Sequence, residues 1–158
     1  MANLSDYIEE HLKKLLALST RNYVDIQRRE LARKFTCVPS QINYVLDSRF
    51  NLESGYLVES KRGGGGYIRI YRVDPNKRRF WKEAMEKIAD GGFNPARVTR
   101  LIKRCYEERL LTRREAQMLE ALLEDDHYAG LLPEPDQLRA LQQKLFIAAL
   151  EAILKESF

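Results

Sequence analysis

Lys61 and Arg62 are the side chains in this sequence that are best placed to bind an anion, because they directly precede a run of glycines. The run consists of Gly63, Gly64, Gly65 and Gly66. Glycine has no β-carbon, so such a backbone can approach a partner closely, and the two cations indicate an anionic partner. The plainer alternative is a flexible turn with solvated charges, and for Lys61 that alternative is almost as strong.

The segments on either side of the glycines are rich in β-branched and aromatic residues. Residues 56–60 and 67–71 both have this composition, which is typical of strands. Two such segments around a glycine turn predict a β-hairpin whose tip is basic.

A second group of polar side chains lies on a helix that we expect to begin near Pro39. Ile42, Val45 and Leu46 recur at helical spacing and face the core. The polar residues that we expect on the exposed side are Ser40, Gln41, Asn43, Tyr44 and Ser48. A glutamine can pair with adenine through two hydrogen bonds, and Arg49 can reach a phosphate or a guanine. The alternative is the ordinary polar face of a surface helix.

The elements before this helix complete a recognisable order. Three predicted elements precede a tight turn that ends at Pro39. They are a helix capped by Asn3 or Ser5, a short edge strand at 23–26 and a short helix at 28–35. Two helices joined in this way form a helix-turn-helix. Followed by the hairpin, they predict a winged helix. We also expect Arg28 and Arg29, at the start of the short helix, to contact DNA.

Charge is distributed unevenly along the chain. Residues 1–73 contain 12 Lys and Arg against 8 Asp and Glu, whereas residues 74–158 contain 15 of each. The basic excess therefore lies entirely in the half with the glycine hairpin. This is the modest electrostatic footprint of a nucleic-acid module joined to a neutral module.

The sequence contains no arrangement typical of an enzyme, a metal site or a cofactor site. Cys37 and Cys105 lie apart from other metal ligands and read as small buried thiols, while His11 and His127 are isolated. There is no apolar run long enough to span a membrane and no signal-peptide pattern. We therefore expect a cytoplasmic protein that is not an enzyme.

The second half of the chain reads as about four helices after a boundary near residue 75. We expect a DNA-binding domain at 1–74 and a helical domain at 75–158, so the fold class is mostly α with a small β-wing. The final helix, 138–158, is apolar over a wide arc. A homodimer interface that includes Leu145, Phe146 and Leu150 explains this arc, because a small domain buries little core alone. The alternative is a self-sufficient bundle.

Two motifs closely resemble the CtsR family, the class-three stress-gene repressors of Gram-positive bacteria. The motifs are Val38-Pro39-Ser40-Gln41-Ile42-Asn43-Tyr44 and Ser60-Lys61-Arg62-Gly63-Gly64-Gly65-Gly66-Tyr67-Ile68. The resemblance implies a dimeric repressor of heat-shock genes for Clp proteases and chaperones. It further implies tandem-repeat operators in double-stranded DNA, a glycine-rich wing in the minor groove, and release of the DNA by heat.

The resemblance also implies two protein partners. They are the protein-arginine kinase McsB, with Arg62 as the phosphorylated side chain, and the ClpC–ClpP protease. A different class of function stays open: an adaptor of the Clp machinery for which DNA binding is incidental.

Overall fold

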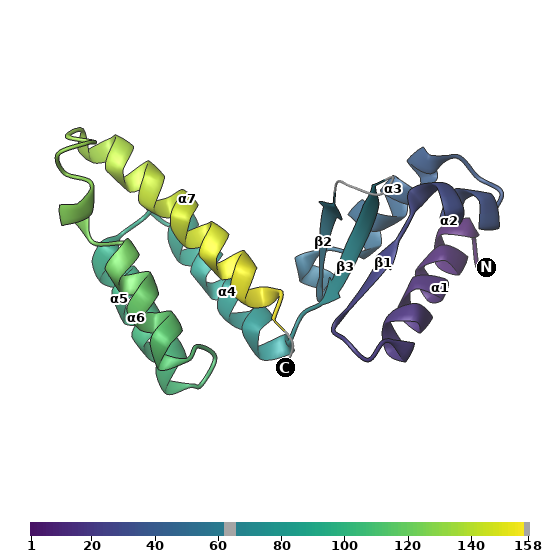
Figure 1. Cartoon of the computed structure of the whole chain (residues 1–158), viewed down its shortest axis with the longest axis horizontal. Coiled ribbons are helices and arrows are strands. Elements are labelled where there is room, and N and C mark those ends of the chain that lie inside the picture. Colours follow the sequence, from purple (N-terminus) through teal and green to yellow (C-terminus); the bar gives the residue numbers. More distant parts are fainter. Residues whose placement is uncertain (62–65, 157–158) are drawn as a thin grey trace. The chain divides into compact units, whose positions relative to one another are not determined.

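The computed structural model describes residues 1–61 and 66–156, which form two compact units (Figure 1). One unit comprises Met1–Pro75 together with the chain from Leu154 onward, and the other comprises Asn76–Ile153. The sequence placed residues 75–158 in a single domain. The last described residues instead belong to the first unit, because the buried side chain of Asn22 donates hydrogen bonds to the carbonyls of Lys155 and Glu156.

The first unit is a three-helix domain with a small antiparallel sheet. Its elements are α1 (Leu4–Leu18), β1 (Tyr23–Ile26), α2 (Arg28–Lys34), α3 (Pro39–Arg49), the short 3₁₀ helix η1 (Leu52–Ser54), β2 (Tyr56–Lys61) and β3 (Tyr67–Arg72). The strand order is β1-β3-β2, with β3 paired to both neighbours. The predicted edge strand at 23–26 is confirmed.

Alternation along β3 separates the two faces of the sheet. Ile68 and Ile70 are fully buried and face the helices, while Arg69 lies on the other face. The core under the sheet is completed by Ile8, Leu12, Leu16, Ile26, Leu31, Ala32, Ile42, Val45, Leu46 and Phe50. This core fixes α3 against α1 and leaves the opposite side of α3 exposed.

Local signals account for the ends of these helices. Asn3 caps α1 in a reciprocal capping box with Asp6, and Pro39 occupies the first turn of α3. Between α2 and α3 the chain turns sharply at Thr36, whose φ is +51°. The helix-turn-helix predicted from the sequence is confirmed.

The second unit consists of helices packed around their own core. They are α4 (Pro75–Ala89), α5 (Pro95–Glu107), α6 (Arg113–Leu122), the 3₁₀ helix η2 (Asp125–His127) and α7 (Pro135–Leu154). Asn94 caps α5, and Thr112 forms a reciprocal capping box with Glu115 at the start of α6. Among the described residues, none of the helices combines the length and apolar character needed to cross a bilayer.

Candidate nucleic-acid interface

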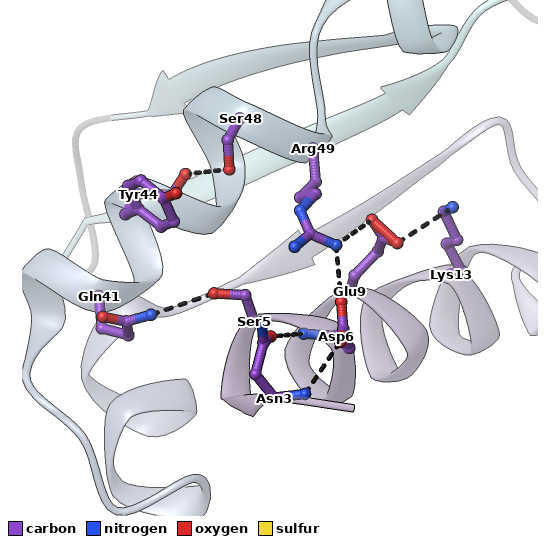
Figure 2. A network of polar contacts seen from close by, with 9 residues as sticks. All are labelled: Asn3, Ser5, Asp6, Glu9, Lys13, Gln41, Tyr44, Ser48 and Arg49. Carbon is purple, nitrogen blue, oxygen red and sulfur yellow. Dashed lines mark hydrogen bonds and ion pairs between the residues drawn. The ribbon is translucent and has the colours of Figure 1, made fainter. Parts of the chain in front are cut away.

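The exposed side of α3 carries most of the polar residues that the sequence assigned to DNA. Ser40, Asn43 and Tyr44 are exposed, the tyrosine to 60%, and Ser48 donates a 2.7 Å hydrogen bond to the Tyr44 carbonyl (Figure 2). Their amides and hydroxyls can donate and accept hydrogen bonds at base edges. The helix therefore presents a polar surface of the kind that a major groove accommodates.

Gln41 lies at the edge of this surface and is half-buried. Its Nε2 atom donates a 3.2 Å hydrogen bond to Oγ of Ser5, a buried residue in the first turn of α1 (Figure 2). The amide carbonyl oxygen and the second N–H take no part in this bond. Ser5 therefore orients the Gln41 amide, and base recognition by Gln41 stays a prediction.

Arg49 has a structural role that the sequence did not predict. Its Nη1 atom lies 2.9 Å from Oδ1 of Asp6 and 3.3 Å from Oε1 of Glu9, as Figure 2 shows. The hydrogen bond that Arg49 donates to the Asp6 carboxylate is the main cause of the raised pKa of Arg49. The pKa of Asp6 is lowered, first by the backbone N–H of Asn3 and then by Arg49. This cluster ties the end of α3 to α1, while a phosphate or guanine contact by Arg49 stays a prediction.

Arg28 connects the second helix of the motif with the wing. Its Nε atom donates a 2.6 Å hydrogen bond to Oδ1 of Asn43, and its Nη2 atom donates one of 3.3 Å to Oγ of Ser60. One guanidinium thus spans α3 and β2 and sets their spacing. Arg29 is exposed beside it. DNA contacts by both arginines stay predictions.

The predicted hairpin is formed by β2 and β3, which pair from Tyr56 opposite Arg72 to Lys61 opposite Tyr67. Gly66 precedes β3 with a φ of +76°, a conformation that glycine adopts without strain. The predicted DNA contacts Arg62, Gly63, Gly64 and Gly65 lie outside the described residues.

Lys61 forms an ion pair with Glu59, which lies on the same face of β2. The hydrogen bond that Lys61 donates to the Glu59 carboxylate is the main cause of the raised pKa of Lys61. Glu59 has a second partner: Nζ of Lys155 lies 2.7 Å from its other carboxylate oxygen. Sequence reasoning missed Lys155, because no local pattern links two residues so far apart in the chain.

The two lysines lower the pKa of Glu59 to about 2 from 4.5, with Lys155 the larger cause. Because the pKa is depressed in the folded state, the ionised carboxylate stabilises the fold above pH ~4.5, and this stabilisation is lost as the pH falls towards ~2.

Between pH ~4.5 and pH ~2, the free energy of unfolding of the wild type should fall by about 1–3 kcal/mol more than that of Glu59→Gln. The measurement is the free energy of unfolding in urea at several pH values between 2 and 7, with the exposed Glu107→Gln as control. A wild-type profile parallel to that of Glu59→Gln would contradict the assignment.

The residues predicted at the dimer interface occupy two different environments. Phe146 and Leu150 are 0% and 2% exposed and fill the core of the helical unit, so they are unsuited to contact a second chain. Leu145, the neighbour of Phe146, is 38% exposed. Helical periodicity identified the apolar arc but could not divide it between the unit's own core and a partner. Of the three residues predicted at the dimer interface, only Leu145 therefore stays proposed as a contact with a second chain.

In the part of the chain that the structure describes, no three His, Cys, Asp or Glu side chains come together as a metal site would require. Cys105 is buried as expected, and burial raises its pKa to about 12, whereas Cys37 is half-buried. Neither cysteine forms a disulfide.

A helix-turn-helix with an exposed polar second helix, followed by a two-stranded wing, defines a winged helix-turn-helix protein. Two family models match the chain: the CtsR N-terminal HTH domain at residues 3–74 and the CtsR C-terminal dimerization domain at residues 77–146. The chain belongs to the CtsR family.

Relatives with the name Transcriptional regulator CtsR match over almost their full length. The protein of Geobacillus stearothermophilus is 43% identical, with 96% of this chain and 99% of the relative covered. That of Bacillus subtilis strain 168 is 40% identical, with 94% and 97% covered. A crystal structure of CtsR in complex with a 26-base-pair DNA duplex also matches this chain. Its protein chain is 38% identical in sequence to this chain, and the match covers 98% of this chain and 100% of the crystallised one, with a TM-score of 0.47. The two family models and these two relatives confirm the family that the two sequence motifs indicated.

Proposed function

We propose that this protein is a sequence-specific DNA-binding repressor of genes for Clp proteases and chaperones, and that it acts as a cytoplasmic homodimer. The observation that carries the proposal is the polar surface of α3, where Ser40, Asn43 and Tyr44 are exposed. Arg28 holds this surface at a fixed spacing from the wing through Asn43 and Ser60. A helix in the major groove and a wing beside it can then contact one stretch of duplex together.

Three further properties belong to the same proposal and rest on the family resemblance. Heat releases the protein from DNA, McsB phosphorylates Arg62, and ClpC–ClpP degrades the protein. A run of glycines loses much conformational entropy when a wing docks, and this cost grows with temperature. The glycines therefore favour release on heating.

The test of the proposal is a salt titration of binding to a tandem-repeat operator and to random duplex of equal length. A repressor should bind the operator at least about 10³ times more tightly and lose affinity steeply with salt on both duplexes. Weak binding with no preference for the operator would refute the proposal and favour a protein adaptor.

Gln41→Ala should weaken operator binding by about 1–3 kcal/mol and leave random-duplex binding nearly unchanged, because a base contact carries specificity and a phosphate contact does not. The exposed Gln137→Ala, on α7, is the matched control and should bind both duplexes normally. Equal weakening on the two duplexes would exclude base recognition by Gln41.

A further inference from the structure

Lys155 and Glu156 lie against the outer face of the sheet, which points away from the helices. The buried amide of Asn22 donates hydrogen bonds of 3.0 and 3.1 Å to the carbonyls of Lys155 and Glu156. The Lys155 ammonium also lies 5.9 Å from the ring centre of Tyr71, which is buried on this face. These contacts hold residues 155 and 156 against the sheet next to the wing.

The Lys155 side chain completes a three-charge cluster on β2. Oε1 of Glu59 pairs with Lys61 and Oε2 pairs with Lys155, so each lysine has its own carboxylate oxygen. The hydroxyl of Tyr71 donates a 3.4 Å hydrogen bond to Oε2. The Glu59 side chain is only 26% exposed, so it would be costly to leave its charge without a cation.

This arrangement determines whether the Lys61 ammonium can leave Glu59 and bind a DNA phosphate. If Lys61 were the only cation on Glu59, a move of its ammonium to a phosphate would strand a partly buried carboxylate. With Lys155 in place, Glu59 stays paired when Lys61 leaves it. Lys61 immediately precedes Arg62 and the glycine run, so the cluster lies at the basic end of the wing.

We propose that Lys155 is a positioning residue for DNA binding, which neutralises Glu59 so that the Lys61 ammonium is available to a phosphate. The proposal rests on the proposed function, since it requires the wing to meet DNA. It assigns Lys155 a part in recognition without any contact between Lys155 and the nucleic acid.

The test is a double-mutant cycle on operator affinity with Lys155→Met and Glu59→Gln. Methionine keeps an unbranched side chain, one atom shorter, and removes its charge. Lys155→Met alone should weaken binding roughly three- to tenfold in low salt and reduce the salt slope by about one phosphate contact. In the Glu59→Gln background, where no carboxylate holds Lys61, the same change should have no effect.

Three further proteins complete the experiment. Lys155→Arg keeps the cation and should bind like the wild type. Lys144→Met removes an equal charge at an exposed position of α7 and should also bind like the wild type. Lys61→Met should remove the effect of Lys155→Met, because Lys155 then has no cation to release.

Two results for the variants overturn the proposal. If Lys155→Met causes an equal loss with Glu59 intact and in the Glu59→Gln background, Lys155 acts on DNA directly or through the fold. No loss in either background means that Lys61 does not depend on Lys155. If the wild-type protein shows no preference for the operator, the proposed function is refuted, and the inference with it. This result is obtained before any variant is measured, so the two failures are distinguishable.

Discussion

Phe146→Ala should destabilise the helical unit by about 3–5 kcal/mol, the largest stability change that we expect from a single truncation in this chain. Phe146 is 0% exposed and packs against Phe93, with ring centres 6.2 Å apart. Its removal leaves a cavity in the core of the helical unit that rigid neighbours fill only in part. In a domain of this size the midpoint of thermal unfolding should fall by more than about 10 °C.

The neighbouring residue gives a matched control for this prediction. Leu145 is on the same turn of α7 but is 38% exposed, so Leu145→Ala should cost less than about 1 kcal/mol of the free energy of unfolding. The measurement is thermal and urea unfolding of both variants beside the wild type. Equal destabilisation by the two truncations would show that the division of α7 into a core side and an outer side is wrong.

The same pair of residues separates folding from assembly. Leu145→Asp should leave the unit folded and weaken the proposed dimer, whereas a charge at Leu150, which is 2% exposed, should unfold the unit. From the sequence alone we expected monomers or insoluble chains from a charge at either position. Sedimentation of Leu145→Asp as a folded dimer with native affinity would show that Leu145 lies away from the interface.

Features that depend on residues close together in the chain could be predicted from the sequence. The cap of α1 at Asn3, one of the two residues that the sequence offered, and the turn at Pro39 are set by residues within one helical turn. The edge strand at 23–26 was also predicted, because its β-prone residues stand isolated between helices.

Contacts between distant residues could not be predicted in this way. Arg49 reads as an exposed cation at the end of a helix, yet it lies between Asp6 and Glu9 of α1. The pairing of Lys155 with Glu59 has no local signature either. Both contacts depend on the tertiary fold, which brings opposite charges together without any spacing rule in the chain.

Arg62→Glu should abolish operator binding, with a loss of at least about 100-fold, and this is the largest functional effect that we expect. The prediction rests on sequence and on chemistry, since Arg62 lies outside the described residues. Arg62 stands between Lys61 and the first of the four glycines. A guanidinium in this position suits a narrow minor groove, where the negative potential is enhanced.

A phosphorylated arginine would act in the same direction as glutamate. The modification adds negative charge to the side chain and occupies donors of the planar guanidinium, so attraction to the DNA backbone becomes repulsion. Arg62→Lys should have an intermediate affinity, because it keeps the charge and loses the paired donors. The slope of log affinity against log salt concentration should fall by the equivalent of about two phosphate contacts for Arg62→Glu and stay unchanged for Arg62→Lys.

The decisive measurement is operator affinity of wild type, Arg62→Glu and Arg62→Lys at one salt concentration, with circular dichroism to show that each is folded. Arg100→Glu, an equal charge reversal at an exposed position of α5, is the control and should bind normally. If Arg62→Glu binds as tightly as the wild type, Arg62 contacts no DNA and its phosphorylation cannot switch binding. If Arg100→Glu loses as much affinity as Arg62→Glu, net charge governs binding, and the position beside the glycines has no special role.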